Sequence, residues 1–251
     1  MNIGIITQAR TSSTRLPNKV LLPIGNKTLL QYHIDRLQET ALPLVVATTA
    51  LPADDVLATF AQKNDLFCFR GSQDNVLSRY YLAAKQYGFD IVIRVTSDCP
   101  LIDGTLILQG LHTYLTHYHA HLYYSNTLER SYARGFDFEI FSFFLLENAY
   151  QNATDPSDLE HVTPYIHQNR SREVELIQHT TTPNHQHQRI TVDTPEDFLL
   201  LKTLIENYKA HTWGYQKISQ FLENNPEIAQ INAHIAQKQY GFIQEQTPTK
   251  P

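Results

Sequence analysis

The fold of this chain is decided by one stretch near its beginning, IGIITQARTSSTRLPNK, residues 3–19. Its first part, 3–6, is a short apolar and β-branched run of the kind that forms a buried strand. The loop that follows carries cations and hydroxyls and no acid, namely Arg10, Arg15 and Lys19 with Thr11, Ser12, Ser13 and Thr14. Such a loop at the carboxyl end of a strand suits a polyanion, because all of these groups can bind phosphate oxygens. A solvated basic loop is the alternative on composition alone.

The loop is neither a Walker A motif nor a dinucleotide-binding fingerprint. Residues 3–19 contain no G-x-x-x-x-G-K-[ST] pattern and no G-x-G-x-x-G pattern. We therefore expect a nucleotide to be gripped here by side chains more than by glycine-exposed backbone.

The composition is typical of one soluble α/β domain. With 251 residues, 42% of them hydrophobic, the chain can bury a sizeable core. A net charge of −5 disfavours general binding to nucleic acid or anionic membranes. Cys68 and Cys99 lie in apolar surroundings, which is typical of reduced thiols in a cytoplasmic protein. No leader pattern or 18-residue apolar run occurs, so we expect no membrane insertion.

Strand patterns alternate with helix patterns through the first hundred residues. Strands are predicted at 3–6, 43–49, 67–72 and 91–95. Helices are predicted at 29–37, with Thr28 as the cap, and at 52–60 and 73–87. This alternation predicts parallel pairing with right-handed crossovers, and hence a three-layer sandwich around a mixed, mostly parallel sheet. Further along we expect helices at 106–118 and 143–152, strands at 123–127, 134–142 and 190–192, a helix from 194, and an amphipathic helical tail over 215–240 broken at 224–226.

One acid stands where a metal could bind, and a second acid has no local explanation. Asp98 follows the strand at 91–95, so it should lie on the same sheet edge as the basic loop. A carboxylate that faces phosphates is what Mg²⁺ bridging requires, although Asp98 could simply form an Asx-turn. The sequence Thr194-Pro195-Glu196-Asp197 is fully explained as a helix start, and it leaves Asp193 unexplained.

Several stretches resemble the cytidylyltransferases of sugar-acid activation. They read QAR, STRLP and KVL within 8–21, GSQDNVLSRYY at 71–81, DCP at 98–100, EHVTPY at 160–165 and VDTPED at 192–197. The chain is most like the spore coat polysaccharide biosynthesis protein F group, and is similar to CMP-KDO synthetases and acylneuraminate cytidylyltransferases. The resemblance covers essentially the whole chain, and Ser97 replaces the usual glycine before Asp98.

The resemblance implies a Rossmann-like fold of the A-type nucleotidyltransferases and transfer of CMP from CTP to a sugar or sugar acid. It implies Mg²⁺ on Asp98 and Asp193, with Arg10 and Lys19 as further catalytic residues. The nucleotide contacts would be Gln8, Ala9, Arg10, Ser13, Arg15, Lys19 and Arg79, and the acceptor contacts Asn126, Asp137, Glu139 and His161. A solvated edge strand explains the two acids of the acceptor set equally well, and a packed structural role explains His161.

The resemblance also implies surface polysaccharide or lipopolysaccharide biosynthesis as the setting, and a homodimer as the candidate assembly. We expect one domain over residues 1–246, with a helical tail at about 215–241 and a disordered end at 247–251. Two alternatives remain open from the residues themselves: a glycosyltransferase that uses a nucleotide-sugar donor, and a non-catalytic nucleotide-binding subunit of a polysaccharide-synthesis complex.

Overall fold

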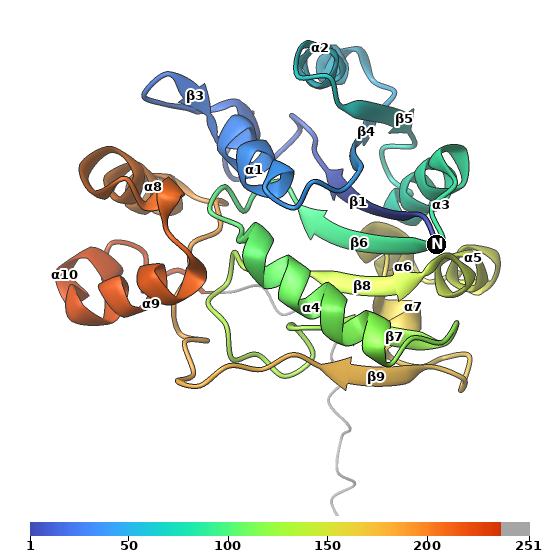
Figure 1. Ribbon diagram of the computed structural model, residues 1–251. Coiled ribbons are helices and arrows are strands. Elements are labelled where there is room, and N and C mark those ends of the chain that lie inside the picture. The colour runs from blue at the N-terminus through green and yellow to red at the C-terminus, as the bar shows by residue number, and fades with distance from the viewer. Residues whose placement is uncertain (237–251) are drawn as a thin grey trace, which may run out of the picture.

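A seven-stranded sheet runs through the middle of the protein, and helices cover both of its faces (Figure 1). The computed structural model describes residues 1–236. Only one strand runs against the others, so the sheet is mixed and mostly parallel, as predicted. From one edge to the other the strands are β5 (Phe67–Gly71), β4 (Leu44–Thr49), β1 (Ile3–Gln8), β6 (Ile91–Thr96), the reversed β8 (Glu139–Ser142), β7 (Leu122–Ser125) and β9 (Glu175–Gln178).

The two helix layers follow from alternation along the strands. In β1, Ile5 packs into the core on one face of the sheet and Ile6 into the core on the other. The first face is covered by α1 (Leu29–Gln38), α2 (Asp55–Lys63), α4 (Gly104–Thr116), α8 (Pro195–Tyr208) and α9 (Tyr215–Asn224). The second is covered by α3 (Val76–Tyr87), α5 (Phe143–Asn152), α6 (Pro156–His161) and α7 (Pro164–His167).

Side-chain caps begin most of the long helices. Thr28, Asn75, Asp103 and Ser142 each accept a hydrogen bond from a main-chain N–H in the first turn of α1, α3, α4 and α5. Thr194 does the same for α8 and forms a capping box with Asp197. These local rules are why the predicted helix positions are close to the observed ones.

The centre of the sheet positions the residues predicted for the site. Gln8, the last residue of β1, pairs with Ala47 of β4 on one side and with Thr96 of β6 on the other. The loops after β1 and β6 therefore leave the same edge of the sheet. A short hairpin, β2 (Pro23–Ile24) and β3 (Lys27–Thr28), follows the one-turn helix η1 (Lys19–Leu21) and leads into α1.

Several predicted bounds were wrong. The helix expected over 52–60 is a short η2 (Pro52–Asp54) followed by α2, and the helix expected from 73 begins at Val76 because Asn75 caps it. The strand expected over 134–142 is formed only from Glu139 onward. Residues 190–192 are not a strand: Ile190 N–H donates to the Arg134 carbonyl (2.7 Å) and an isolated bridge joins Arg134 to Arg189. The edge strand β9 was not predicted.

The tail breaks where expected. It consists of α9, preceded by η3 (Ala210–Thr212), and α10 (Pro226–Ala229), with Asn225 and Pro226 at the break. The predicted tail residues from 237 and the predicted disordered end at 247–251 lie outside the described residues. Within residues 1–236, no helix has both the length and the apolar character needed to cross a membrane.

Candidate functional site

The loop over 9–18 leaves the carboxyl end of β1 and is held in place by Asp54. Asp54 is buried, and its Oδ1 accepts hydrogen bonds from the Thr11 main-chain N–H (2.8 Å) and the Thr11 hydroxyl (2.6 Å). Its other oxygen accepts from the Thr49 hydroxyl at the end of β4. Burial alone would raise the pKa of Asp54, but these hydrogen bonds lower it. Thr11 and Thr49 thus shape the loop, whereas the hydroxyls of residues 12–14 line a cleft beside it.

Two carboxylates from distant parts of the chain meet the end of this loop. Asp98 lies in the turn after β6, and Asp193 lies just before α8. The Lys19 ammonium donates to Asp98 Oδ2 at 2.9 Å and to Asp193 Oδ1 at 2.6 Å. Arg15 Nη2 lies 3.0 Å from the other oxygen of Asp193. The basic loop and the two acids therefore form one charged cluster.

The charges in this cluster reinforce one another. Burial alone would raise the pKa of Asp98, but the Lys19 ammonium outweighs it and lowers that pKa to about 2. Burial alone would likewise lower the pKa of Lys19, and Asp98 and Asp193 together raise it. Asp98 and Lys19 are therefore both charged at neutral pH.

The turn that carries Asp98 is tied to β1 by His33 of α1. The His33 side chain is fully buried, and its Nδ1 lies 2.8 Å from the Cys99 carbonyl oxygen. Because a carbonyl can only accept, Nδ1 carries the proton and Nε2 accepts from the Thr7 hydroxyl at 2.9 Å. Burial lowers the pKa of His33 to about 4, so the ring is neutral at pH 7.

Asp193 is held from its other side by Arg189. The Arg189 Nη2 lies 3.0 Å from Asp193 Oδ2, and the same guanidinium donates to both oxygens of Asp197 at 2.8 and 2.9 Å. Asp197 also accepts from the main-chain N–H groups of Asp193 (2.9 Å) and Thr194 (3.1 Å). The start of α8 and the Arg189 side chain thus fix the position of Asp193 together.

The cluster lies in an open cleft of about 1060 Å³. Nearly all of the residues predicted for the site line this cleft. They are Gln8, Ala9, Arg10, Ser13, Arg15, Lys19, Arg79, Asp98, Asp137, Glu139, His161 and Asp193.

Asn126 is the predicted residue that the structure keeps away from the cleft. Its side chain is fully buried, its Nδ2 donates to the Phe136 carbonyl (2.8 Å) and its Oδ1 accepts from the Phe138 N–H (3.0 Å). The predicted contact between Asn126 and an acceptor is therefore not supported, because the amide is used to hold the segment before β8. Arg79 does reach the cleft wall, but its Nη1 donates to the Ser72 carbonyl at 2.6 Å.

Glu139 of β8 lines the cleft, and its carboxylate is bound on both oxygens by neighbouring side chains. Its Oε2 pairs with Arg94 of β6 at 2.5 Å. Its Oε1 accepts from the hydroxyls of Tyr123 (3.0 Å) and Thr163 (2.9 Å). The Glu139 side chain is 9% exposed. Both oxygens of this buried carboxylate already have partners, so Glu139 is better suited to stabilise the cleft wall than to bind a ligand directly.

A second group of cations, Arg130 and Arg134, lines the same cleft. Arg130 forms a two-pronged ion pair with Asp137, with distances of 2.6 and 2.8 Å. Arg134 lies close by, and its pKa is lowered to about 10 by burial and by the neighbouring guanidinium groups of Arg130 and Arg189, which Asp137 offsets only in part. His161 is half-buried in the cleft wall, and burial lowers its pKa.

The sequence reasoning missed four of the arginines, Arg94, Arg130, Arg134 and Arg189. One signal was available for Arg94, which interrupts the β-branched run 91–95 and is therefore a charge inside a predicted central strand. Arg130 lies in a segment without a periodic pattern, and Arg134 and Arg189 stand at the start of, or just before, segments predicted as strands. None of these patterns indicates which side chains the folded chain brings to the charged cluster or to the cleft.

The acids of the cluster fit a magnesium ion whose remaining ligands come from a substrate. Asp98 and Asp193 already share one cation, the Lys19 ammonium, and Mg²⁺ prefers carboxylate and phosphate oxygens. Within the part of the chain that the structure describes, no group of three or more His, Cys, Asp or Glu side chains could hold a metal. A metal here would therefore depend on substrate phosphates, as is usual for Mg²⁺ at nucleotide sites.

Comparison with known proteins identifies relatives over the whole chain. A family model described as cytidylyltransferase matches residues 3–239. An uncharacterized protein of Methanocaldococcus jannaschii is 34% identical over 97% of this chain and 99% of its own length. Spore coat polysaccharide biosynthesis protein SpsF of Bacillus subtilis is 30% identical over 91% of this chain and 97% of its own. A solved cytidylyltransferase from Leptospira borgpetersenii has a TM-score of 0.87 and 35% identity, covering 92% of this chain and 97% of that one.

Proposed function

The chain belongs to the cytidylyltransferase family, and from this premise we propose that it moves CMP from CTP to a sugar acid, with Mg²⁺, and releases pyrophosphate. One observation supports the proposal above all. A basic loop and two carboxylates converge on Lys19, at 2.9 Å from Asp98 and 2.6 Å from Asp193, inside a single cleft. Nucleotidyl transfer needs cations for a triphosphate beside acids for a metal, and this cleft holds both.

The reaction replaces one phosphorus–oxygen bond by another. An acceptor hydroxyl oxygen attacks the α-phosphorus of CTP and gives up its proton to solvent water. The bond from that phosphorus to the oxygen that bridges to the β-phosphate breaks, and pyrophosphate leaves with the electron pair of that bond. Arg10, Arg15 and Lys19 line the cleft and would neutralise the charge on the leaving pyrophosphate. Asp98 and Asp193 would hold Mg²⁺, which, when bound, would draw charge from the α-phosphate. Catalysis is then mainly positioning and electrostatics.

The second group of cations supports an acidic acceptor over a neutral sugar. Arg134 is half-buried and is repelled by Arg130 and Arg189, which together with burial lowers its pKa to about 10. A carboxylate bound between these guanidinium groups would relieve that repulsion, whereas a neutral hydroxyl would not. The name of the Bacillus subtilis relative adds polysaccharide synthesis as the proposed setting.

The test is pyrophosphate release from each of the four nucleoside triphosphates with Mg²⁺, against a panel of 3-deoxy and nonulosonic sugar acids. Asp98→Asn and Lys19→Ala are the matched variants, and each should lower the rate by about a hundredfold, the usual cost of one lost charge contact in a transition state. Release that requires CTP, one sugar acid and both residues would establish the reaction.

Other results would point elsewhere. Release that is equal with all four triphosphates would contradict the assignment of CTP. Binding of CTP with no turnover across the panel would favour a non-catalytic subunit. Failure to bind CTP at all would contradict the role of the basic loop, and hydrolysis or transfer from a nucleotide sugar would then favour the glycosyltransferase.

A further inference from the structure

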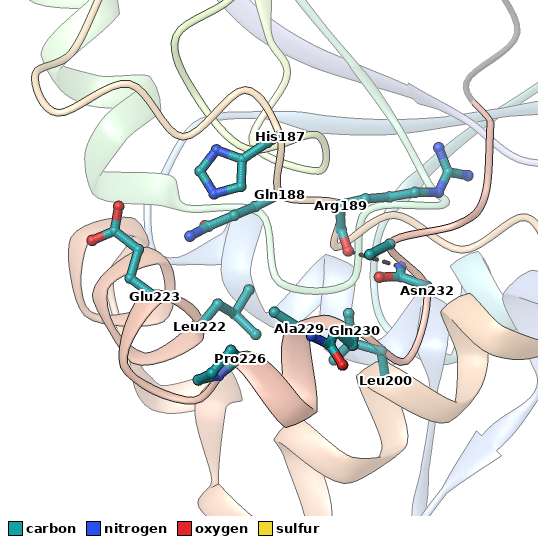
Figure 2. A pocket seen from close by; sticks show the side chains of 11 residues that line it. His187, Gln188, Arg189, Leu200, Leu222, Glu223, Pro226, Ala229, Gln230 and Asn232 are labelled. Carbon is teal, nitrogen blue, oxygen red and sulfur yellow. Dashed lines mark hydrogen bonds between the residues drawn. The ribbon is translucent and has the colours of Figure 1, made fainter.

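The C-terminal helices lie over the residues that fix Asp193. Figure 2 shows Leu222 of α9 and Pro226 of α10 on one side of a pocket whose other walls are α8 and the segment 187–189. The pocket has a volume of about 320 Å³. Part of the boundary between the tail and the body is therefore an unfilled pocket. Each polar contact between the tail and the body then contributes a larger share of the interaction than it would in a closely packed interface.

One of these contacts reaches the charged cluster. Asn232 is 3% exposed, and its Nδ2 donates to the Arg189 carbonyl oxygen at 3.0 Å and to Asp197 Oδ1 at 2.8 Å. The first of these bonds is drawn in Figure 2. The Asn232 amide thus donates one hydrogen bond to each of the two residues that hold Asp193, namely Arg189 and Asp197.

The path from Asn232 to Asp193 is short and fully hydrogen-bonded. Arg189 donates to both oxygens of Asp197 and, through Nη2, to Asp193 Oδ2 at 3.0 Å. Asp197 in turn accepts from the Asp193 main-chain N–H at 2.9 Å. We call the Arg189 guanidinium with the Asp193 and Asp197 carboxylates the Arg189 clamp. Asn232 therefore holds both the main-chain carbonyl of Arg189 and the carboxylate of Asp197 in this clamp.

We propose that Asn232 is a positioning residue for Asp193, so that the C-terminal tail is part of the catalytic apparatus although, within residues 1–236, it contributes no residue to the cleft lining. The inference rests on the proposed function only for the role of Asp193. Removing the amide leaves the buried Asp197 carboxylate and the Arg189 carbonyl one donor short, and both can then shift. Residues that orient metal-binding carboxylates in this way are typically worth 10- to 100-fold in metal affinity or activity.

The experiment compares Asn232→Leu with Asn225→Leu in the full chain. Asn225 lies in the same tail, but its Nδ2 donates to the Phe221 carbonyl of α9 at 2.8 Å, so its loss leaves the Arg189 clamp untouched. Hydrogen–deuterium exchange of the segment 189–197, without ligands, is the first readout. Fluorescence of Trp213, the only tryptophan, reports whether α9 keeps its position, because the Trp213 ring packs against Phe221 of α9 with the ring centroids 5.3 Å apart. The second readout is the affinity for CTP with Mg²⁺, measured by calorimetry.

We expect Asn232→Leu to speed exchange in 189–197 by about tenfold and to weaken CTP–Mg²⁺ binding by about tenfold, with Trp213 fluorescence unchanged. Asn225→Leu should change neither. The proposal is overturned if exchange in 189–197 stays at the wild-type rate in Asn232→Leu, or if both variants speed it equally. If Asn232→Leu does not fold, Asn232→Ala replaces it. A wild-type protein that binds no CTP would defeat the proposed function, while the exchange data would still decide the link from Asn232 to Asp193.

Discussion

Replacing Lys19 by methionine removes the ammonium that Asp98 and Asp193 share and keeps most of the side-chain stem. In the wild type, Lys19 outweighs burial and holds the pKa of Asp98 at about 2, against an ordinary value of 3.8. One pKa unit corresponds to about 1.4 kcal/mol, so this lowering stabilises the folded state by about 2 kcal/mol at neutral pH.

The sign of the pH dependence follows from the lowered pKa. A carboxyl group with a lowered folded-state pKa contributes stability that is complete above its unfolded pKa and is lost as the pH falls through the folded value. In Lys19→Met, burial acts without the compensating lysine and no longer leaves the pKa of Asp98 lowered. We expect the variant to be less stable than the wild type by about 2 kcal/mol at pH 7, and the difference to shrink to about half at pH 3.

Urea unfolding at pH 7, 5 and 3 measures this difference directly. Lys27→Met is the matched control, because Lys27 forms a pair of similar length with Asp35 (2.7 Å) but the two side chains are 42% and 35% exposed. An exposed pair of this kind is worth about 0.2–1 kcal/mol. The reasoning is refuted if the loss in Lys19→Met stays constant from pH 7 to pH 3, or if it is no larger than the loss in Lys27→Met.

Three further predictions concern other parts of the site. Asp54→Ala removes the acceptor for two Thr11 hydrogen bonds, so the KM for CTP should rise by about tenfold in steady-state kinetics, and an unchanged KM would contradict the anchoring role. His33 has a pKa of about 4 because it is buried, so the wild type should lose up to about 3 kcal/mol of unfolding free energy as the pH falls from 6.5 to 4. In His33→Gln, the unfolding free energy from urea titrations should not show this decrease between pH 6.5 and 4. A decrease equal to that of the wild type would contradict the assignment of the pH dependence to His33. Arg134→Ala should raise the KM for the acceptor by about tenfold and leave the KM for CTP unchanged, with partial recovery in Arg134→Lys; equal effects on both substrates would show that Arg134 does not distinguish them.

Features that depend on neighbouring residues were predictable from the sequence. The strand at β1 and the caps at Thr28 and Thr194 obey rules that act over a few positions, and the structure confirms them. The alternation of strands and helices was enough to predict that the residues after β1 and β6 leave the same sheet edge, since parallel strands with helical crossovers leave few other arrangements.

Features that depend on distant residues were not predictable. Residues 134–138 carry the same alternation as a strand, but they bend away from the sheet because Arg134 pairs with the backbone at 188–190 instead. Asn126 was expected to contact an acceptor because of the family resemblance, yet its amide is used by two main-chain groups about ten residues further on. The Asn232 amide reaches Arg189 across 43 residues of sequence and Asp197 across 35, so these contacts exist only after folding.

The separation between Lys19 and its two partners bears on how the protein matures during translation. Asp98 is 79 residues and Asp193 is 174 residues further along the chain. At about 5–20 residues per second, a ribosome adds Asp193 some 10–35 seconds after Lys19. Strands β1, β4, β5 and β6 are complete by residue 96, so half of the sheet can assemble while the second acid has yet to be made. We therefore expect nascent chains to lack the complete charged cluster until Asp193 has been made, and chains terminated before Asp193 never to form it.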